Sequence, residues 1–146
     1  MRVLIVYDSV YGNTERVAEA IASGLAGEVR LVRADKMDPS ALGSTDLLIV
    51  GSPTQGGRPT AVVQDLIAKL PFDQMKGMKV AAFDTRLTGR FAKIFGYAAD
   101  KISTELTAKG ASLVSDPQPF FVTGKKGPLK DGESERAVNW AKGITK

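Results

Sequence analysis

The chain has 146 residues, of which 43% are hydrophobic and 25% are charged, as in an ordinary globular domain. It contains neither cysteine nor histidine, which excludes disulfides, thiolate metal sites, cysteine nucleophiles and a serine–histidine–aspartate hydrolase. The net charge of +4 favours anionic partners. This length predicts a single domain over residues 1–146. Because Asp8 ends the first apolar run, we expect no signal peptide, no membrane insertion and a cytoplasmic protein.

The first expected unit is a strand, a turn and a helix. The apolar run Val3–Tyr7 is typical of a strand buried on both faces of a parallel sheet. After the turn, apolar residues recur at helical spacing from Asn13, and Gly27 is predicted to stop that helix. Two more strands are expected over 29–32 and 47–50, the second followed by a loop rich in glycine and proline.

The second half of the chain continues the alternation. Thr60 is predicted to cap a helix that reaches Leu70, and Lys79–Phe83 is the fourth strand. A further helix is expected from its apolar stripe of Phe91, Ile94, Phe95, Ala98, Ile102 and Leu106. The last strand, over 112–115 and 119–122, is interrupted by Asp116 and Pro117. A final helix over 133–144 takes Asp131 as its cap.

Strands and helices alternate throughout, without repeats or a linker. This order predicts an α/β domain with a mainly parallel sheet and helices on both faces. Ligands of such sheets bind at the carboxyl ends of the strands. The loops that follow Tyr7, Val50, Phe83 and Val122 are therefore the candidate site.

The loop Asp8–Thr14 has the composition of a phosphate cup. A helix start offers unpaired N–H groups and a partial positive charge, and Gly12 lets the backbone approach a ligand closely. Ser9 and Thr14 add hydroxyl donors. The loop holds no Lys or Arg and has neither a GKS/T nor a GxGxxG pattern, which suits a phosphate monoester that is held rather than transferred. Helix capping by Ser9 and Thr14 without a ligand is the alternative.

The segment from Ile5 to Ile21 resembles the phosphate-loop signature of flavodoxins. The matching residues are Ile5, Val6, Tyr7, Ser9, Gly12, Thr14, Ala18 and Ile21. The order of strands and helices, and the length of the chain, are similar to those of short-chain flavodoxins. The resemblance implies a flavodoxin-like three-layer sandwich, with a five-stranded parallel sheet of order 2-1-3-4-5 and non-covalently bound FMN.

The resemblance also implies which residues surround FMN. The first loop would hold the phosphate through Ser9, Val10, Tyr11, Gly12, Asn13 and Thr14. The loop after the third strand would cover the isoalloxazine ring, and its glycine peptide would reorient toward the flavin N5 on reduction; its residues are Pro53, Thr54, Gln55, Gly56 and Gly57. The loop after the fourth strand would contact the pyrimidine edge through the backbone of Asp84, Thr85 and Arg86.

The sequence departs from the family in its aromatic residues. Tyr11 stands where many flavodoxins have Thr, and resembles the loops of flavodoxin-like quinone reductases and of flavodoxin domains in flavo-diiron proteins. The second loop has no aromatic residue to stack on the flavin. The aromatic residues Phe91, Phe95, Tyr97 and Trp140 are predicted to pack within the fold rather than to stack on the ring.

The second departure is charge, because flavodoxins are typically acidic. Arg58, Arg86 and Arg90 lie in the loops nearest the implied ring, and Lys125–Lys130 follows the last strand on the site side. Arginines that face the ring would raise the potential at which the flavin is fully reduced. If these basic residues form a rim, they would dock an acidic redox partner or a phosphorylated reductant. If they form only a solvated loop, they would have no such role.

We therefore expect an FMN-binding electron carrier that serves redox partner proteins, with acidic docking surfaces on those partners, and that binds no nucleic acid. A flavin-dependent NAD(P)H:quinone oxidoreductase is the alternative; Tyr11 favours it and the short chain argues against it. A phosphorylation-controlled receiver domain is disfavoured, because Asp8 stands alone and Val50-Gly51-Ser52 supplies no phosphoacceptor.

Overall fold

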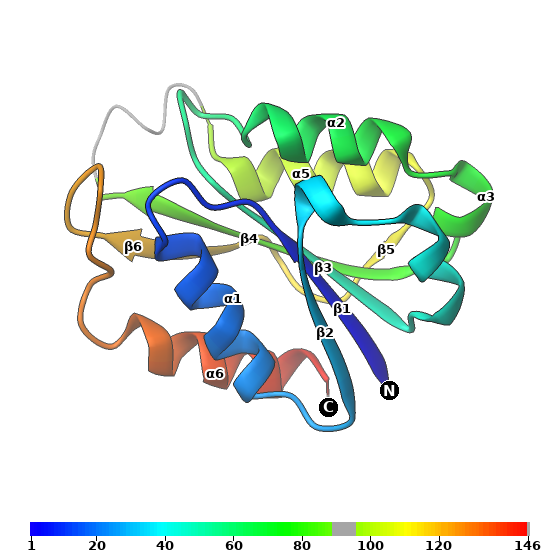
Figure 1. The fold of residues 1–146 in the computed structure, drawn as a ribbon, viewed down its shortest axis with the longest axis horizontal. Coiled ribbons are helices and arrows are strands. Elements are labelled where there is room, and N and C mark those ends of the chain that lie inside the picture. Colours follow the sequence, from blue (N-terminus) through cyan, green and yellow to red (C-terminus); the bar gives the residue numbers. More distant parts are fainter. Residues whose placement is uncertain (89–95, 146) are drawn as a thin grey trace.

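A parallel sheet forms the centre of the computed structural model, which describes residues 1–88 and 96–145 (Figure 1). The strand order is β2-β1-β3-β4-β5, and β6 also pairs with β4, beyond the end of β5. This order confirms the predicted fold class. The strands are β1 (Arg2–Tyr7), β2 (Glu28–Arg33), β3 (Leu47–Pro53), β4 (Lys79–Leu87), β5 (Ser112–Leu113) and β6 (Gln118–Val122).

Helices cover both faces of the sheet, as predicted. One face carries α1 (Asn13–Ser23) and α6 (Glu133–Ile144), and the other carries α2 (Ala61–Lys69) and α5 (Ala98–Ala108) (Figure 1). The connections hold short helices that the sequence did not predict, namely α3 (Phe72–Met75), η1 (Ala34–Lys36) and η2 (Pro39–Ser44). In the described part of the chain, no helix is long and apolar enough to cross a membrane.

The core consists of two layers because strand side chains alternate between the faces of the sheet. Leu4 and Val6 point into the layer under α2 and α5. Their neighbours Val3 and Ile5 point into the layer under α1 and α6. The central strands are therefore buried on both sides, which explains why their sequences are continuous apolar runs.

The layer under α1 and α6 is packed around the ring of Phe83. This ring lies over Gly51 of β3, and a Cβ added at Gly51 would come within 2.0 Å of it. Phe120 and Trp140 contact the same ring edge-on, with centroids at 6.2 and 6.4 Å. Trp140 also donates a hydrogen bond to the Ser115 hydroxyl at 3.0 Å, so its predicted role in packing is confirmed.

Two predicted helix ends were wrong and one was confirmed. The first helix ends at Ser23 rather than at Gly27, with Gly24 as its C-cap; Gly24 also packs against α6, and a Cβ there would lie 2.7 Å from the carbonyl of Val138. Thr60 occupies the N-cap position of α2, as predicted, although its hydroxyl makes no hydrogen bond within the described residues. At the start of α6 the capping position belongs to Gly132, with φ at +85°, and not to Asp131.

The ends of β4 and of the last predicted strand are set by pairing with neighbouring strands rather than by the apolar runs of the sequence. The apolar run ends at Phe83, yet β4 continues to Leu87 because β3 and β6 still pair with it on both sides. The predicted interruption of the last strand is confirmed, since β5 and β6 flank Asp116 and Pro117 and both pair with β4. The next helix begins at Ala98, and the predictions for Phe91, Ile94 and Phe95 lie outside the described residues.

Glu133 fastens α6 to β6, and its replacement should weaken the fold in a pH-dependent way. Its carboxylate bonds the guanidinium of Arg136 and accepts from the Phe121 N–H at 2.7 Å. These bonds, chiefly that from Arg136, hold the pKa of Glu133 below its usual value. The stabilisation is complete above the pKa of the unfolded chain, about 4.3, and is lost as the pH falls through the lower pKa of the folded state.

We expect Glu133→Gln to lower the free energy of unfolding at pH 7 by about 1–2 kcal/mol, near the lower limit because Arg136 is partly exposed. At pH 3 the variant and the parent should differ less. The exposed Glu135→Gln, on the same helix, is the control. Chemical denaturation at several pH values measures the difference, and an equal loss at pH 3 and pH 7 would contradict this account.

Candidate functional site

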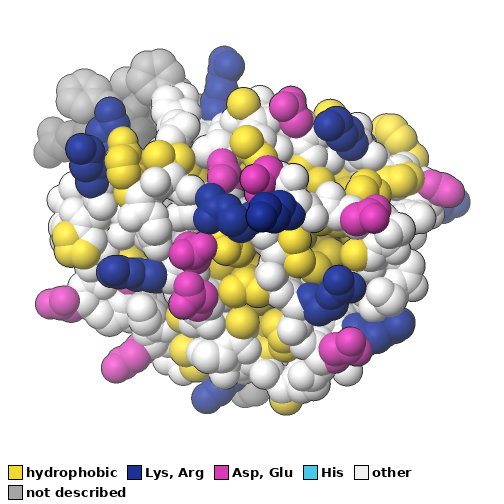
Figure 2. All heavy atoms as spheres, in the orientation of Figure 1, with side chains coloured by type: hydrophobic (Ala, Val, Ile, Leu, Met, Phe, Trp, Pro, Cys, Tyr) yellow, Lys and Arg dark blue, Asp and Glu magenta, His cyan; other side chains and the backbone are white. Residues whose placement is uncertain are grey.

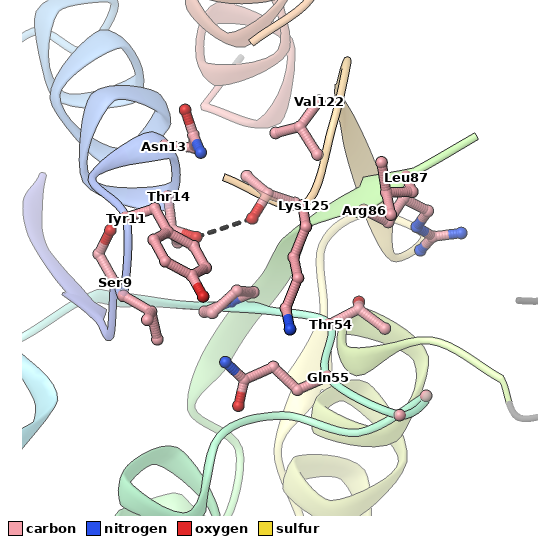
Figure 3. A pocket seen from close by; sticks show the side chains of 15 residues that line it. Ser9, Tyr11, Asn13, Thr14, Thr54, Gln55, Arg86, Leu87, Val122 and Lys125 are labelled. Atoms are coloured by element: carbon pink, nitrogen blue, oxygen red, sulfur yellow. Dashed lines mark hydrogen bonds between the residues drawn. The ribbon is translucent and has the colours of Figure 1, made fainter. Parts of the chain in front are cut away.

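A pocket of about 590 Å³ lies at the carboxyl ends of β1, β3 and β4 (Figure 3). This volume is within the usual range for small-molecule and cofactor sites. It is lined by Ser9, Val10, Tyr11, Asn13, Thr14, Pro53, Thr54, Gln55, Gly56, Gly57, Thr85, Arg86, Leu87, Val122 and Lys125. The structure thus brings the predicted site residues together around one pocket, with the exception of Gly12 and Asp84, which do not line it.

The first loop presents unpaired backbone donors to the pocket. Within the described residues, the structure gives no hydrogen-bond acceptor to four N–H groups of this loop, those of Val10, Tyr11, Asn13 and Thr14. The Ser9 hydroxyl takes two others, from Gly12 at 3.1 Å and from Glu15 at 3.3 Å. Gly12 turns the chain into α1 with φ at +91°, a conformation that favours glycine. Four open donors at a helix N-terminus can bind an anion.

A pair of buried hydroxyl groups lies beside these donors. The Oγ1 atoms of Thr14 and Thr85 are 2.8 Å apart, and both residues are buried (Figure 3). Alternation along β4 turns Thr85 toward α1, so its side chain lies next to the first loop. One hydroxyl proton joins the pair, and the other is left to donate to a ligand.

Asp84 lies on the opposite face of β4 and does not face the pocket. Its carboxylate bonds the Arg86 guanidinium at 2.8 and 2.7 Å and accepts from the Ala99 N–H at 2.9 Å. Burial raises the pKa of Asp84, while Arg86 opposes that rise. The ring of Tyr97 stacks on the guanidinium, with its centroid 3.4 Å away. The Asp84 side chain therefore holds the start of α5 and points away from the pocket, whereas the prediction concerned its backbone.

The arginines of the second and third loops leave little positive charge in the middle of the pocket, where the structure describes them. The charge of Arg86 is compensated by Asp84, and Figure 3 shows its side chain turned away from the middle of the pocket. Arg58 is exposed and does not line the pocket. Arg90 lies outside the described residues.

The second loop closes another side of the pocket with a tight turn. Gln55 and Arg58 exchange two backbone hydrogen bonds, at 2.8 and 3.0 Å. Between them, Gly56 and Gly57 have φ of +56° and +78°, the signs required in a two-residue hairpin turn of type I′. Thr54 ties this loop to α5, because its hydroxyl accepts from the Ala98 N–H at 3.1 Å.

Three lining residues were missed as pocket residues from the sequence. Leu87 and Val122 form an aliphatic wall, and Lys125, which was expected only as part of a basic rim, reaches between Tyr11 and Thr54 (Figure 3). Leu87 follows Thr85 by two residues, so a longer β4 would have placed both on one face. Lys125 makes no ion pair or hydrogen bond within the described residues.

The loop after β6 is packed against the first loop. The Asn13 side-chain amide donates to the carbonyl of Lys126 at 3.2 Å. Gly127 has φ at +98°, and a Cβ there would lie 2.5 Å from the Asn13 amide oxygen. A side chain at 127 would therefore separate the two loops.

A doubly wound parallel sheet whose first loop offers unpaired N–H donors at a helix start is typical of proteins that hold phosphorylated cofactors at the ends of their strands. The sequence model of the flavodoxin family matches residues 5–140. The chain therefore belongs to the flavodoxin family, a family of FMN-binding electron-transfer proteins.

Individual relatives agree with this assignment. The chain is 30% identical over 153 aligned positions to a flavodoxin of Maridesulfovibrio salexigens. The alignment covers 97% of this chain and 94% of that protein. It is 34% identical over 121 residues to diflavin flavoprotein A 2 of Thermosynechococcus vestitus, covering 77% of this chain and only 20% of that protein. The crystal structure of flavodoxin 2 from Bacillus cereus superposes with a TM-score of 0.77 at 27% identity, covering 99% of this chain and 98% of that chain.

Proposed function

We propose that the protein binds FMN non-covalently in this pocket and carries electrons between partner proteins. The observation that supports the proposal most strongly is the group of four open N–H donors beside a pocket of about 590 Å³. These donors, with the free proton of the Thr14–Thr85 pair, suit the phosphate of FMN. The glycine turn at 56–57 and the aliphatic wall of Leu87 and Val122 suit a flat, largely apolar ring.

FMN, when bound, supplies the redox chemistry, and the chain positions it. The first loop holds the phosphate end, and the second loop lies along the ring. No carboxylate is among the residues that line the pocket, and histidine is absent from the chain, so the described wall offers no group with an ordinary pKa near neutrality. This composition suits electron transfer better than acid–base conversion of a substrate.

The mouth of the pocket combines apolar and basic side chains. Val10, Tyr11 and Leu87 are 51%, 44% and 46% exposed. Lys125 and Lys126 are also exposed, and the Lys126 ammonium lies 6.0 Å from the centre of the Tyr11 ring. Such a surface complements a redox partner that presents carboxylates around an apolar contact. The proposed partners are therefore proteins with acidic docking surfaces.

A visible absorption spectrum of the purified protein tests the proposal. After addition of excess FMN and removal of the unbound fraction, we expect the bands of oxidised flavin at about one FMN per chain. A protein that retains no flavin would contradict the proposal. Steady-state oxidation of NAD(P)H by a quinone, with the flavin-loaded protein, would instead indicate the reductase alternative.

Lys125 is expected to raise the reduction potential of bound FMN, because a cation favours the anionic reduced flavin. Lys125→Met should lower the midpoint potential of the second one-electron step, which completes the reduction of the flavin, by on the order of 30–60 mV. This follows from about 1 kcal/mol for one nearby charge in a water-exposed site and about 59 mV per 1.4 kcal/mol for one electron. Lys142→Met, on the exposed face of α6, is the matched control. A spectroscopic redox titration measures both, and equal shifts would refute a role for Lys125.

A further inference from the structure

Arg33 lies directly behind the phosphate cup, although it belongs to another strand. It is the last residue of β2, in register with Tyr7 at the end of β1, where the first loop begins. Its guanidinium donates to the carbonyl of Ser9 at 3.0 Å. The sequence gives no sign of this contact, since the loop itself contains no basic residue.

Carboxylates hold the guanidinium in place from two sides. One of its nitrogens is 3.2 Å from Glu15 of α1, and another is 3.6 Å from Asp8. Tyr7 donates from its hydroxyl to the same Glu15 oxygen at 2.8 Å, and its ring lies 5.5 Å from the guanidinium carbon. Figure 2 shows basic and acidic side chains side by side on this face, over the end of β2 and the start of α1.

The hydrogen bond from Arg33 to the Ser9 carbonyl fixes the direction of one N–H donor of the first loop. A trans peptide is planar, so its C=O and N–H point in opposite directions. The Ser9 carbonyl and the Val10 N–H belong to the same peptide. A guanidinium that holds this carbonyl therefore turns the Val10 N–H to the opposite side; Val10 lines the pocket, and its N–H has no acceptor among the described residues.

We propose that Arg33 is a positioning residue that orients the Val10 peptide, and with it the cup, toward the phosphate group of the ligand. The inference rests on the proposed binding of FMN. Arg33 acts through the peptide rather than by its charge alone, because Asp8 and Glu15 offset that charge. It therefore sets the preference of the pocket for a phosphorylated flavin over the same flavin without phosphate.

The test compares Arg33→Met with Arg30→Met. Arg30 lies on the same strand and is exposed, and its side chain makes no ion pair or hydrogen bond among the described residues, so the charge change is matched. Fluorescence titration gives the affinity for FMN and for riboflavin, which lacks the phosphate. We expect R33M to weaken FMN binding about tenfold, to change riboflavin binding less than about twofold, and to keep this difference at high salt.

Three results would overturn the inference: an equal loss for both flavins, no loss, or a loss that disappears at high salt. Thermal unfolding of the flavin-free variants checks that they fold. If R33M does not fold, R33K is used in its place, because it keeps the charge but lacks the planar guanidinium that donates to Ser9. If the parent protein binds no FMN, the proposed function fails on its own. The same variants are then titrated with inorganic phosphate while the Val10 amide is followed by NMR, and an unchanged response in R33M would refute the role of Arg33.

Discussion

Riboflavin is expected to bind this protein about 1,000-fold more weakly than FMN. A hydrogen bond to a charged acceptor contributes about 1.5–3 kcal/mol, and four N–H groups of the first loop are open to the phosphate. Bonds to one group are not additive, so we take their combined contribution as about 4 kcal/mol, which corresponds to about three orders of magnitude. Riboflavin leaves those donors without the anion, while it keeps every contact of the ring.

Quenching of flavin fluorescence in a titration measures both affinities. Screening weakens long-range attraction far more than short hydrogen bonds, so the ratio of the two affinities should change little between low and high salt. A ratio below about tenfold would mean that the cup does not hold the phosphate and that the ring dominates binding.

Gly51→Ala is expected to destabilise the fold by about 3 kcal/mol or more. The added Cβ would come within 2.0 Å of the Phe83 ring, which is fully buried and held by Phe120 and Trp140. Because the ring is enclosed by these neighbours, either the strands separate or the aromatic cluster shifts. Chemical denaturation of the flavin-free protein measures the loss.

A double-mutant cycle identifies the cause of that loss. Phe83→Leu removes the ring edge, so Gly51→Ala should cost less in that background, by about 1–2 kcal/mol. Gly43→Ala is the control, since a Cβ at Gly43 meets nothing within 4 Å, and it should change the stability by less than about 0.5 kcal/mol. Additive effects of the two core substitutions would show that Phe83 is not the obstacle.

The fold could be predicted from the sequence because its signals are local. Continuous apolar runs such as Val3–Tyr7 mark strands that are buried on both faces, and helical spacing marks the layers that cover them. The errors arose where tertiary contacts decide. For example, β4 continues through polar residues because its neighbours keep pairing with it.

The sequence located the residues that line the pocket where a single segment supplies them, and missed those that distant segments bring to it. The first two loops lie at the pocket as expected. The ion pair of Asp84 with Arg86 was not foreseen, because the sequence does not show that β4 reaches residue 87. Lys125 and Arg33 approach the pocket and the cup from distant segments, and no spacing in the chain relates them to the first loop.

The contact of Asn13 with the loop around Gly127 has a consequence for biosynthesis. The first loop is synthesised before the residues that complete the pocket, Val122 and Lys125. A nascent chain that has formed β1, β3 and β4 still lacks these two residues. Retention of the cofactor is therefore expected only after the segment through Lys125 has been made, and a truncated translation product that stops before β6 should emerge without flavin.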